Sequence, residues 1–282
     1  MIVFVNGAFT EAGLQIAVGD RGFLLGDGVF ETIYVKGGRA AFLDAHLARL
    51  GKGLVALRID PPADLSRLGD IIAGLASQND GEGDAAARVT ISRGAGARGL
   101  AFPASDETPP TMLATLVPYA APAGPARLTV SARRRYSGGS TLAFKAVGGY
   151  AENMLALDEA RRAGADDALL LNEHGRIVCA SASNLFLIDD KGRLATPALS
   201  EGAMQGVTRT LVIEGARSLG LEVSEQKIKQ GDLTGALLFL TNSLAGLRPA
   251  CIDGGGDAEN DSVFRALRTW YGERLAAETG TP

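Results

Sequence analysis

The stretch LAFKAVGGYAENMLALDEARRAG, residues 142–164, places one lysine in an apolar run and then begins a helix. Lys145 is the only lysine between Lys52 and Lys191, and its immediate neighbours are apolar. Because poor hydration disfavours the ammonium form, this pattern predicts a lowered pKa, which a Schiff-base lysine requires. The alternative is a lysine whose stem covers apolar surface while its amine stays in water.

The second part of the stretch predicts an amphipathic helix over about 150–163, ended by Gly164. Met154, Leu155 and Leu157 are expected to face inward, with acids and arginines outward. Further along the chain, patterning predicts strands at 168–171, 177–181, 184–188 and 237–240 and helices at about 207–219 and 261–277. A strand at 127–132 precedes the lysine stretch.

A proline-rich segment, PYAAPAGP at 118–125, separates this part from the beginning of the chain. Proline suppresses both helix and ladder pairing, so we expect a linker there. Before it, patterning predicts strands at 2–6, 30–35, 40–43, 87–93 and 111–118 and helices at 44–57, capped by Asp44, and 64–77. We therefore expect an α+β or α/β protein of two domains, a small one at 1–117 and a larger one at 127–282, joined by a linker at 118–126.

Composition excludes several classes of protein. The chain of 282 residues has a net charge of −4, which argues against nucleic acid as a main partner. No apolar run approaches the length that a bilayer needs, and no secretory signal begins the chain, so we expect a cytoplasmic protein with no membrane partner. Cys179 and Cys251 are expected to be buried thiols. His46 and His174 have no partner at ligand spacing, so no metal site is predicted.

Two further segments are suited to binding phosphate. Gly206 precedes a helix whose first amides belong to Val207 and Thr208, and helix N-termini bind anions. A buried strand ends at Thr241 and Asn242, which can complete such a cradle; capping of a helix and of a turn are the alternatives. Phosphate donors beside a poorly hydrated lysine indicate an aldehyde cofactor that carries a phosphate, pyridoxal 5′-phosphate (PLP).

The segment GAGARG, residues 94–99, matches the dinucleotide pattern G-x-G-x-x-G. It runs into LAFPASDETPP, whose three prolines cannot open the helix that would bind a pyrophosphate. We therefore reject a Rossmann domain.

Taken in order, several blocks resemble the fold-type IV PLP enzymes, the class-IV aminotransferase family, over nearly the whole chain. They are GDRGFLLGDGVFET, HLARL, TISRGAGARG, the lysine stretch through VCASASNLF, LATP, GAMQGVTR and LTNSLAGLRP. The resemblance implies a D-amino acid aminotransferase-like fold, with the active site between a small and a larger domain and completed in a homodimer.

The resemblance also implies roles for individual residues. Lys145 is similar to the Schiff-base lysine and Arg49 to the arginine that binds the cofactor phosphate, with Val207, Thr208, Thr241 and Asn242 as the other phosphate donors. Arg98, or failing that Arg93, is expected to bind a substrate carboxylate. Phe30 stands where D-amino acid aminotransferases place a tyrosine, and His46 and Asp27 match structural members of the pocket wall.

One position departs from the family pattern. Where the family has a glutamate that holds the pyridine nitrogen protonated, five residues before Asn184, this chain has Cys179. A thiol is a weak donor and acceptor, so we expect a ring nitrogen that is largely unprotonated.

Two segments, TISRGAGARGL and LTNSLAGLRP, are more similar to aminodeoxychorismate lyases than to the other members of the family. The departure at Cys179 favours the same activity on a small-molecule amine, because aromatisation of the lyase product supplies the driving force. The alternatives are an aminotransferase acting on branched-chain or D-amino acids, and a PLP-binding protein without catalysis.

Overall fold

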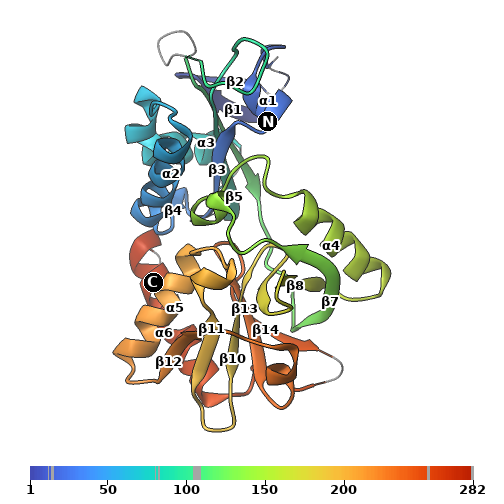
Figure 1. Ribbon diagram of the computed structural model, residues 1–282. Helices are drawn as coiled ribbons and strands as arrows, with labels where there is room; N and C mark the ends of the chain where they lie inside the picture. Colours follow the sequence, from blue (N-terminus) through green and yellow to red (C-terminus); the bar gives the residue numbers. More distant parts are fainter. Residues whose placement is uncertain are drawn as a thin grey trace. The chain divides into compact units, whose positions relative to one another are not determined.

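The computed structural model describes residues 1–11, 13, 16–79, 81, 83–103, 109–252 and 255–280. The chain divides into two units, and the division after Ala120 lies inside the segment expected to be a linker. Ala143–Gly149 and the end of the chain from Leu275 belong to the first unit, and the remainder of the chain after Ala120 forms the second. Lys145, which the sequence placed in the second domain, therefore lies in the first unit. Figure 1 shows the elements of both units.

The first unit is built on a six-stranded antiparallel sheet in the order β2-β1-β6-β5-β3-β4. Its strands are β1 (Ile2–Val5), β2 (Ala8–Glu11), β3 (Gly28–Lys36), β4 (Arg39–Ala40), β5 (Asp84–Ser92) and β6 (Thr111–Pro118). Its helices are α1 (Arg21–Leu25), α2 (Leu43–Leu57), the 3-10 helix η1 (Ala63–Arg67) and α3 (Leu68–Gln78).

The alternating side chains of β3 show which face of this sheet is packed in the core. Val29, Ile33 and Val35 belong to one buried cluster with residues of α2 and α3, such as Leu54 and Ile72. Side chains of a strand alternate between its two faces, so Phe30 points to the opposite face. Glu31 shares the core face with these apolar residues, and this unusual placement determines much of the candidate site.

The second unit is built on an eight-stranded mixed sheet in the order β12-β11-β10-β13-β14-β7-β8-β9. Its strands are β7 (Ala126–Arg135), β8 (Asp167–Asn172), β9 (Ile177–Ala180), β10 (Asn184–Ile188), β11 (Leu194–Pro197), β12 (Val223–Gln226), β13 (Leu237–Asn242) and β14 (Gly246–Ile252). Its helices are α4 (Ala151–Arg162), α5 (Val207–Ser218), most of α6 (Ser262–Thr279) and the 3-10 helices η2 (Ser140–Ala143, whose last residue belongs to the first unit), η3 (Leu199–Glu201) and η4 (Gln230–Leu233).

Two helices, α2 and α4, correct details of the sequence prediction. The α2 helix begins at Leu43 behind Phe42, which has a positive φ of 52° and makes no side-chain cap, so Asp44 lies in the first turn and is not the cap. In α4, Met154 and Leu155 are exposed, while Asn153, Ala156 and Ala160 are buried. Small residues face the sheet because the helix packs closely on β7 and β8. Gly164, with a φ of 80°, follows the end of α4 as predicted.

Most other elements follow the prediction with shifted ends, but the helix expected at 64–77 is divided into η1 and α3, and the short helices α1, η2, η3 and η4 were not predicted. The strands β2, β11, β12 and β14 were not predicted; β2 is wholly exposed, and β12 is a four-residue strand of which no residue is buried. No helix follows Gly99 in the described part of the chain up to Pro103, which agrees with the rejected Rossmann domain, whereas residues 104–108 of the proline-rich stretch lie outside the described residues.

Candidate functional site

Lys145 is held by pairing with the first unit's sheet. The amide of Phe30 donates to the Lys145 carbonyl at 3.0 Å, the amide of Val147 donates to the Gly28 carbonyl at 2.9 Å, and Val29 forms an antiparallel bridge with Ala146. Because Phe144 and Ala146 point into the core, the side chain of Lys145 leaves on the other face. Its amine lies 5.0 Å from the centre of the Phe30 ring.

Desolvation lowers the pKa of Lys145 to about 8. The carboxylate of Glu31 opposes this shift, whereas the guanidinium groups of Arg49 and Arg88 add to it. An amine with this pKa is partly neutral near neutral pH, as nucleophilic attack on a carbonyl requires. The prediction of a lysine with a lowered pKa is therefore supported, although Lys145 as a whole is half-buried and keeps some contact with water.

Glu31, on β3, forms a buried cluster with His46 and Arg49 of α2. Its Oε1 accepts from Arg49 Nε at 2.7 Å, and its Oε2 accepts from Arg49 Nη2 at 2.6 Å and from His46 Nδ1 at 2.7 Å. Since a carboxylate can only accept, the His46 Nδ1 carries the proton. Burial lowers the pKa of His46, which leaves the imidazole neutral. Burial raises the pKa of Glu31, but the hydrogen bonds from Arg49 and His46 bring it down to about 2.

On the sheet face that carries Phe30, a second cation lies near the ring, in addition to Lys145. Arg88, from the neighbouring strand β5, lies over the Phe30 ring with its Cζ 3.9 Å from the centroid. Phe30 itself is only 5 % exposed. The ring is thus in contact with both the amine of Lys145 and the guanidinium of Arg88, and cation–π contacts stabilise both partners.

Arg93 is held within the protein. Its Nε and Nη2 donate to Asp27 at 2.7 and 3.1 Å, and its Nη1 and Nη2 donate to the carbonyls of Arg58 and Leu57 at 2.9 and 2.5 Å. It is 4 % exposed. These contacts make Arg93 a structural anchor, and its place as the second choice for a substrate carboxylate stays a prediction. Arg98, the first choice, is exposed.

In the second unit, the beginning of α5 is an uncapped helix N-terminus. Gly206 occupies the N-cap position and supplies no side chain, so the first amides, among them those of Val207 and Thr208, have no side-chain cap. A Cβ at Gly206 would overlap Oδ1 of Asn184, so a larger residue here would have to displace that side chain. Asn184 pairs with Thr241 across β10 and β13, which brings Thr241 to the same end of the sheet.

Two hydroxyls at this place have unsatisfied hydrogen bonding. Among the described residues, Oγ1 of Thr208 and of Thr241 is buried and has no hydrogen-bond partner of good geometry. The phenol of Tyr271, whose pKa burial raises to about 12, lies close enough to Thr208 to oppose that shift in part. Buried hydroxyls are normally paired, so the hydroxyl of Thr241, which has no such neighbour among the described residues, fits an oxyanion ligand such as a phosphate.

Asn242 is already engaged by its turn. Its Oδ1 accepts from the amides of Leu244 and Ala245 at 3.0 and 2.7 Å, and its Nδ2 donates to Ser183 Oγ at 3.0 Å. The turn-capping alternative therefore holds for this side chain, although these contacts use only one of its two Nδ2 hydrogens.

Cys179 lies in β9 beside a guanidinium. Nη1 of Arg135, in β7, is 4.0 Å from the Cys179 sulfur, and Nε of Arg135 is buried without a partner among the described residues. Burial raises the pKa of the Cys179 thiol, which keeps it neutral. Cys179 is buried as predicted, whereas Cys251 is only half-buried.

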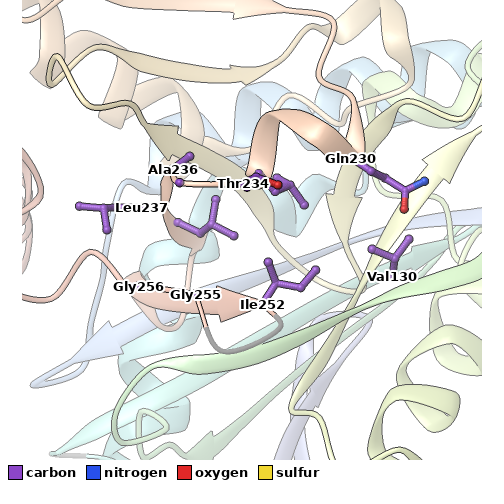
Figure 2. Close-up of a pocket in the computed structure, with 11 residues that line it drawn as sticks. Val130, Gln230, Thr234, Ala236, Leu237, Ile252, Gly255 and Gly256 are labelled. Atoms are coloured by element: carbon purple, nitrogen blue, oxygen red, sulfur yellow. The ribbon is translucent and has the colours of Figure 1, made fainter.

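A cavity of about 310 Å³ lies elsewhere in the second unit, and its lining residues are drawn in Figure 2. Apolar side chains such as Val130, Leu233 and Ile252 line it together with Gln230 and Thr234. None of its lining residues is a candidate site residue, so the cavity and the candidate site are separate.

Metal-binding clusters and membrane spans are both absent from the described part of the chain. No group of three or more His, Cys, Asp or Glu side chains is placed there to hold a metal ion. No helix among these residues is long and apolar enough to cross a bilayer.

Sequence reasoning missed Glu31, Arg88 and Arg135. A signal for Glu31 was available, because a carboxylate at a core position of a strand requires a partner, and His46 and Arg49 share one face of the following helix. Arg88 and Arg135 carry no such signal, since arginines on strands are ordinarily exposed.

Comparison with known proteins places these features in one family. A family model described as "Amino-transferase class IV" matches residues 28–251. A protein of Methanocaldococcus jannaschii named "Putative branched-chain-amino-acid aminotransferase" is 31 % identical over 99 % of this chain and 100 % of its own length. The "Aminodeoxychorismate lyase" of Bacillus subtilis is 32 % identical over 88 % of this chain and 85 % of its own. The solved branched-chain aminotransferase of Thermoproteus uzoniensis, with norvaline, is 25 % identical with a TM-score of 0.89, covering 99 % of this chain and 96 % of the other.

Proposed function

We propose, from the premise that this chain belongs to the class IV aminotransferase family, that it binds PLP and acts as an aminodeoxychorismate lyase. The reaction would convert 4-amino-4-deoxychorismate into 4-aminobenzoate and pyruvate. When bound, PLP supplies an electron sink for negative charge that develops beside the substrate amine. The fold and the PLP-dependent class of the enzyme follow from the family, whereas the bound cofactor, the substrate and the residue roles are proposed.

Lys145 is the proposed attachment point for the cofactor aldehyde. Its pKa of about 8 leaves a usable fraction of neutral amine near neutral pH. The substrate amine would take the place of Lys145 on the cofactor. The freed amine of Lys145 is then the proposed base, which removes a proton from the substrate ring carbon that carries the nitrogen. The backbone of residues 145–147 is hydrogen-bonded to β3, which holds the base of the Lys145 side chain in place during both steps.

The phosphate donors are proposed in both units. In the first unit, Arg49 is the proposed phosphate arginine, and its hydrogen bonds to Glu31 fix the orientation of its guanidinium. In the second unit, Val207 and Thr208 offer the amides of a helix N-terminus, Thr241 offers a buried hydroxyl, and Asn242 offers its second Nδ2 hydrogen. The unpaired hydroxyl of Thr241 supports a phosphate ligand at this place, whereas the hydroxyl of Thr208 lies beside the Tyr271 phenol.

The substrate residues are proposed on the loop that follows β5 and on β3. Arg98 is exposed and is the proposed partner of a substrate carboxylate. Phe30 presents an apolar ring with no hydroxyl beside Lys145, which suits a ring-shaped or aliphatic substrate better than one that needs a polar contact.

The observation that carries the lyase reaction is the pair of Cys179 and Arg135. A neutral thiol beside a guanidinium cannot hold a proton on the pyridine nitrogen as a carboxylate does, so the cofactor is a weaker electron sink. A reaction whose product is aromatic supplies its own driving force and tolerates that weakness, whereas transamination does not.

A branched-chain or D-amino acid aminotransferase is the second candidate. It is favoured by the likeness over nearly the full length to the M. jannaschii protein and to the T. uzoniensis enzyme. The absence of a tyrosine hydroxyl at Phe30 speaks against the D-amino acid branch. A protein that binds PLP without turnover is the third candidate.

A coupled assay distinguishes the three candidates. Purified protein with 4-amino-4-deoxychorismate should release pyruvate without any 2-oxo acid acceptor. Exchange between amino acids and 2-oxo acids without pyruvate release would favour the aminotransferase, and a yellow protein inactive in both assays would favour the third. Borohydride reduction followed by digestion should place the pyridoxyl group on the Lys145 peptide; a label elsewhere, or none, overturns the proposal.

The family resemblance also supports two proposals about assembly and partners. We propose a homodimer whose ligand is a small-molecule amine and whose location is the cytoplasm. A molecular mass by light scattering near twice the 29.2 kDa of one chain would support the dimer.

A further inference from the structure

The loop that carries Arg98 is fastened by Arg21, the first residue of α1. Nη1 of Arg21 donates to the carbonyl of Gly99 at 2.8 Å and, more weakly, to that of Ala97 at 3.4 Å. These two carbonyls flank Arg98 on either side. The Arg21 guanidinium is itself buried, and its Nε donates to Asp27 at 2.8 Å.

The beginning of the same loop is fastened by Arg93. Asp27 accepts from both Arg21 and Arg93, so one buried carboxylate joins the two arginines. Arg93 also stacks over the ring of Phe102, with its Cζ 4.3 Å from the centroid. Asp27 therefore ties together α1 and both ends of the segment 93–102.

Backbone contacts complete the attachment. The Arg21 amide donates to the Gly94 carbonyl at 2.9 Å, and the Gly96 amide donates to the Gly19 carbonyl at 3.1 Å. Asp20 caps α1 through the amide of Gly22 and accepts from Ser92 Oγ, at the end of β5. The loop is thus joined to α1 along most of its length while Arg98 remains exposed.

We infer that Arg21 is a positioning residue for substrate binding: bridged to Asp27, it holds the carbonyls on both sides of Arg98 and so fixes where that guanidinium can meet a carboxylate. The inference rests on the proposed role of Arg98. A carboxylate clamp gains affinity when its loop is fixed before binding, because the ordering of the loop is then not subtracted from the binding free energy. Arg21 touches no reacting atom in this account, and its effect passes through Arg98.

Arg21→Met is the variant that tests this inference. Methionine fills a similar buried volume and removes the donors, and Asp27 keeps its bidentate pair with Arg93, so no buried charge is left alone. Kinetics are measured on the holoenzyme with the amine substrate that the coupled assay identifies. We expect the KM of the variant to rise about tenfold, with kcat changed less than twofold. Arg21→Lys, which keeps a cation beside Asp27, should restore part of the affinity.

A double-mutant cycle separates positioning from general damage. Arg98→Ala should raise the KM by roughly ten- to a hundredfold, and Arg21→Met should add little in the Arg98→Ala background, because the two act on one contact. The dissociation constant of 4-methylvaleric acid, an unreactive carboxylic acid followed through the cofactor's visible absorbance, should follow the same pattern. Additive effects of the two substitutions would overturn the inference.

Proteolysis provides a readout that needs no substrate. Trypsin cuts after Arg98 only when the loop opens, so Arg21→Met should increase the rate of this one cleavage several-fold relative to the wild type. Equal rates would contradict the inference, even if the KM rises. An Arg98→Ala enzyme with unchanged KM would instead contradict the proposed clamp, while faster cleavage in Arg21→Met would still show that Arg21 holds the loop.

Discussion

Glu31 holds Arg49 through two hydrogen bonds, 2.7 Å from Nε to Oε1 and 2.6 Å from Nη2 to Oε2, with both side chains buried. The pair fixes the guanidinium on α2 in one orientation relative to β3. The carboxylate also faces His46 on the same helix and contributes to the electrostatics of Lys145 on the adjoining segment. One acid on the core face of the sheet therefore supports the proposed phosphate arginine and influences the proposed Schiff-base lysine.

The ionisation of Glu31 should make stability depend on pH in a defined window. Its pKa is lowered from 4.5 to about 2 in the folded protein. The ionised group therefore stabilises the fold fully above pH 4.5, and that contribution, about 3 kcal/mol, is lost as the pH falls from 4.5 towards 2. Urea unfolding of wild type and Glu31→Gln from about pH 6 to about pH 3 should show the difference between the two shrinking with acidification. A difference that stays constant over this range would contradict the shifted pKa.

Lys145 should reduce the stability of the protein without cofactor. Its folded pKa of about 8 lies below the usual value of 10.5, so at pH below 8 the charged amine is held where it is poorly solvated. We expect Lys145→Met to be more stable than wild type by about 2 to 3 kcal/mol near neutral pH, with the gain disappearing as the pH rises from 8 to 10.5. Urea unfolding of both proteins freed of cofactor at about pH 7 and about pH 10 measures this. The variant should also lose covalent PLP and turnover, and equal stabilities at neutral pH would show that the amine is well hydrated.

Two glycines of α2 form a matched pair for testing how the helix supports Lys145. A Cβ at Gly53 would lie 2.7 Å from Val29 Cγ1 and 2.9 Å from Phe144 Cδ2, whereas a Cβ at Gly51 meets nothing within 4 Å. Ala normally favours a helix over Gly by about 1 kcal/mol, so Gly51→Ala should stabilise. Gly53→Ala should instead destabilise by about 1 to 3 kcal/mol and weaken PLP binding, because it displaces the residue before Lys145. Thermal unfolding and PLP titration of both variants check this. Stabilisation by Gly53→Ala would contradict it, because Val29 and Phe144 would then move aside at no cost.

The sequence predicted most of the regular elements because alternation and turn residues carry that information locally. The strand at 111–118 was placed at the observed bounds, and Gly164 ended its helix. The inward face of α4 was wrong because Met154 and Leu155 looked like core residues by their size. Packing close to β7 and β8 instead selected Ala156 and Ala160, and a helix pattern gives no measure of how near its sheet lies.

The site was only partly predictable for a related reason. Lys145, Thr208 and Thr241 carry local signals of poor hydration, a helix start and a strand end. The partners of Arg93 come from Asp27, Leu57 and Arg58, which lie in separate parts of the chain. Neither spacing nor periodicity indicates that these residues meet, so the contacts of Arg93 could not be predicted from the sequence.

The unpaired hydroxyl of Thr241 should matter for the cofactor and not for the fold. Thr241→Val keeps the shape and removes a buried group that has no partner among the described residues, so the unfolding free energy should stay within about 1 kcal/mol of wild type or rise. PLP affinity should fall about tenfold if the hydroxyl binds the phosphate.

Thr196→Val is the matched control for that substitution. Its buried hydroxyl donates to the Leu185 carbonyl at 2.7 Å, so this variant should lose about 1 kcal/mol or more of stability and keep its PLP affinity. Fluorescence titration with PLP, beside urea unfolding, measures both quantities. Equal PLP affinity in wild type and Thr241→Val would remove Thr241 from the phosphate site.

Cys179 offers a direct test of the proposed weak electron sink. In Cys179→Glu the new carboxylate would lie beside Arg135, which can compensate part of its burial, and it would accept a hydrogen bond from a protonated pyridine nitrogen. The ¹⁵N shift of labelled PLP should then report a protonated ring in the variant and an unprotonated ring in wild type near neutral pH. Amino-group transfer from an amino acid to the cofactor should become at least about tenfold faster in the variant, whereas Cys179→Ser, neutral and of similar size, should change neither quantity. A protonated ring nitrogen in the wild type would remove the argument for a lyase, because the cofactor would then support transamination equally well.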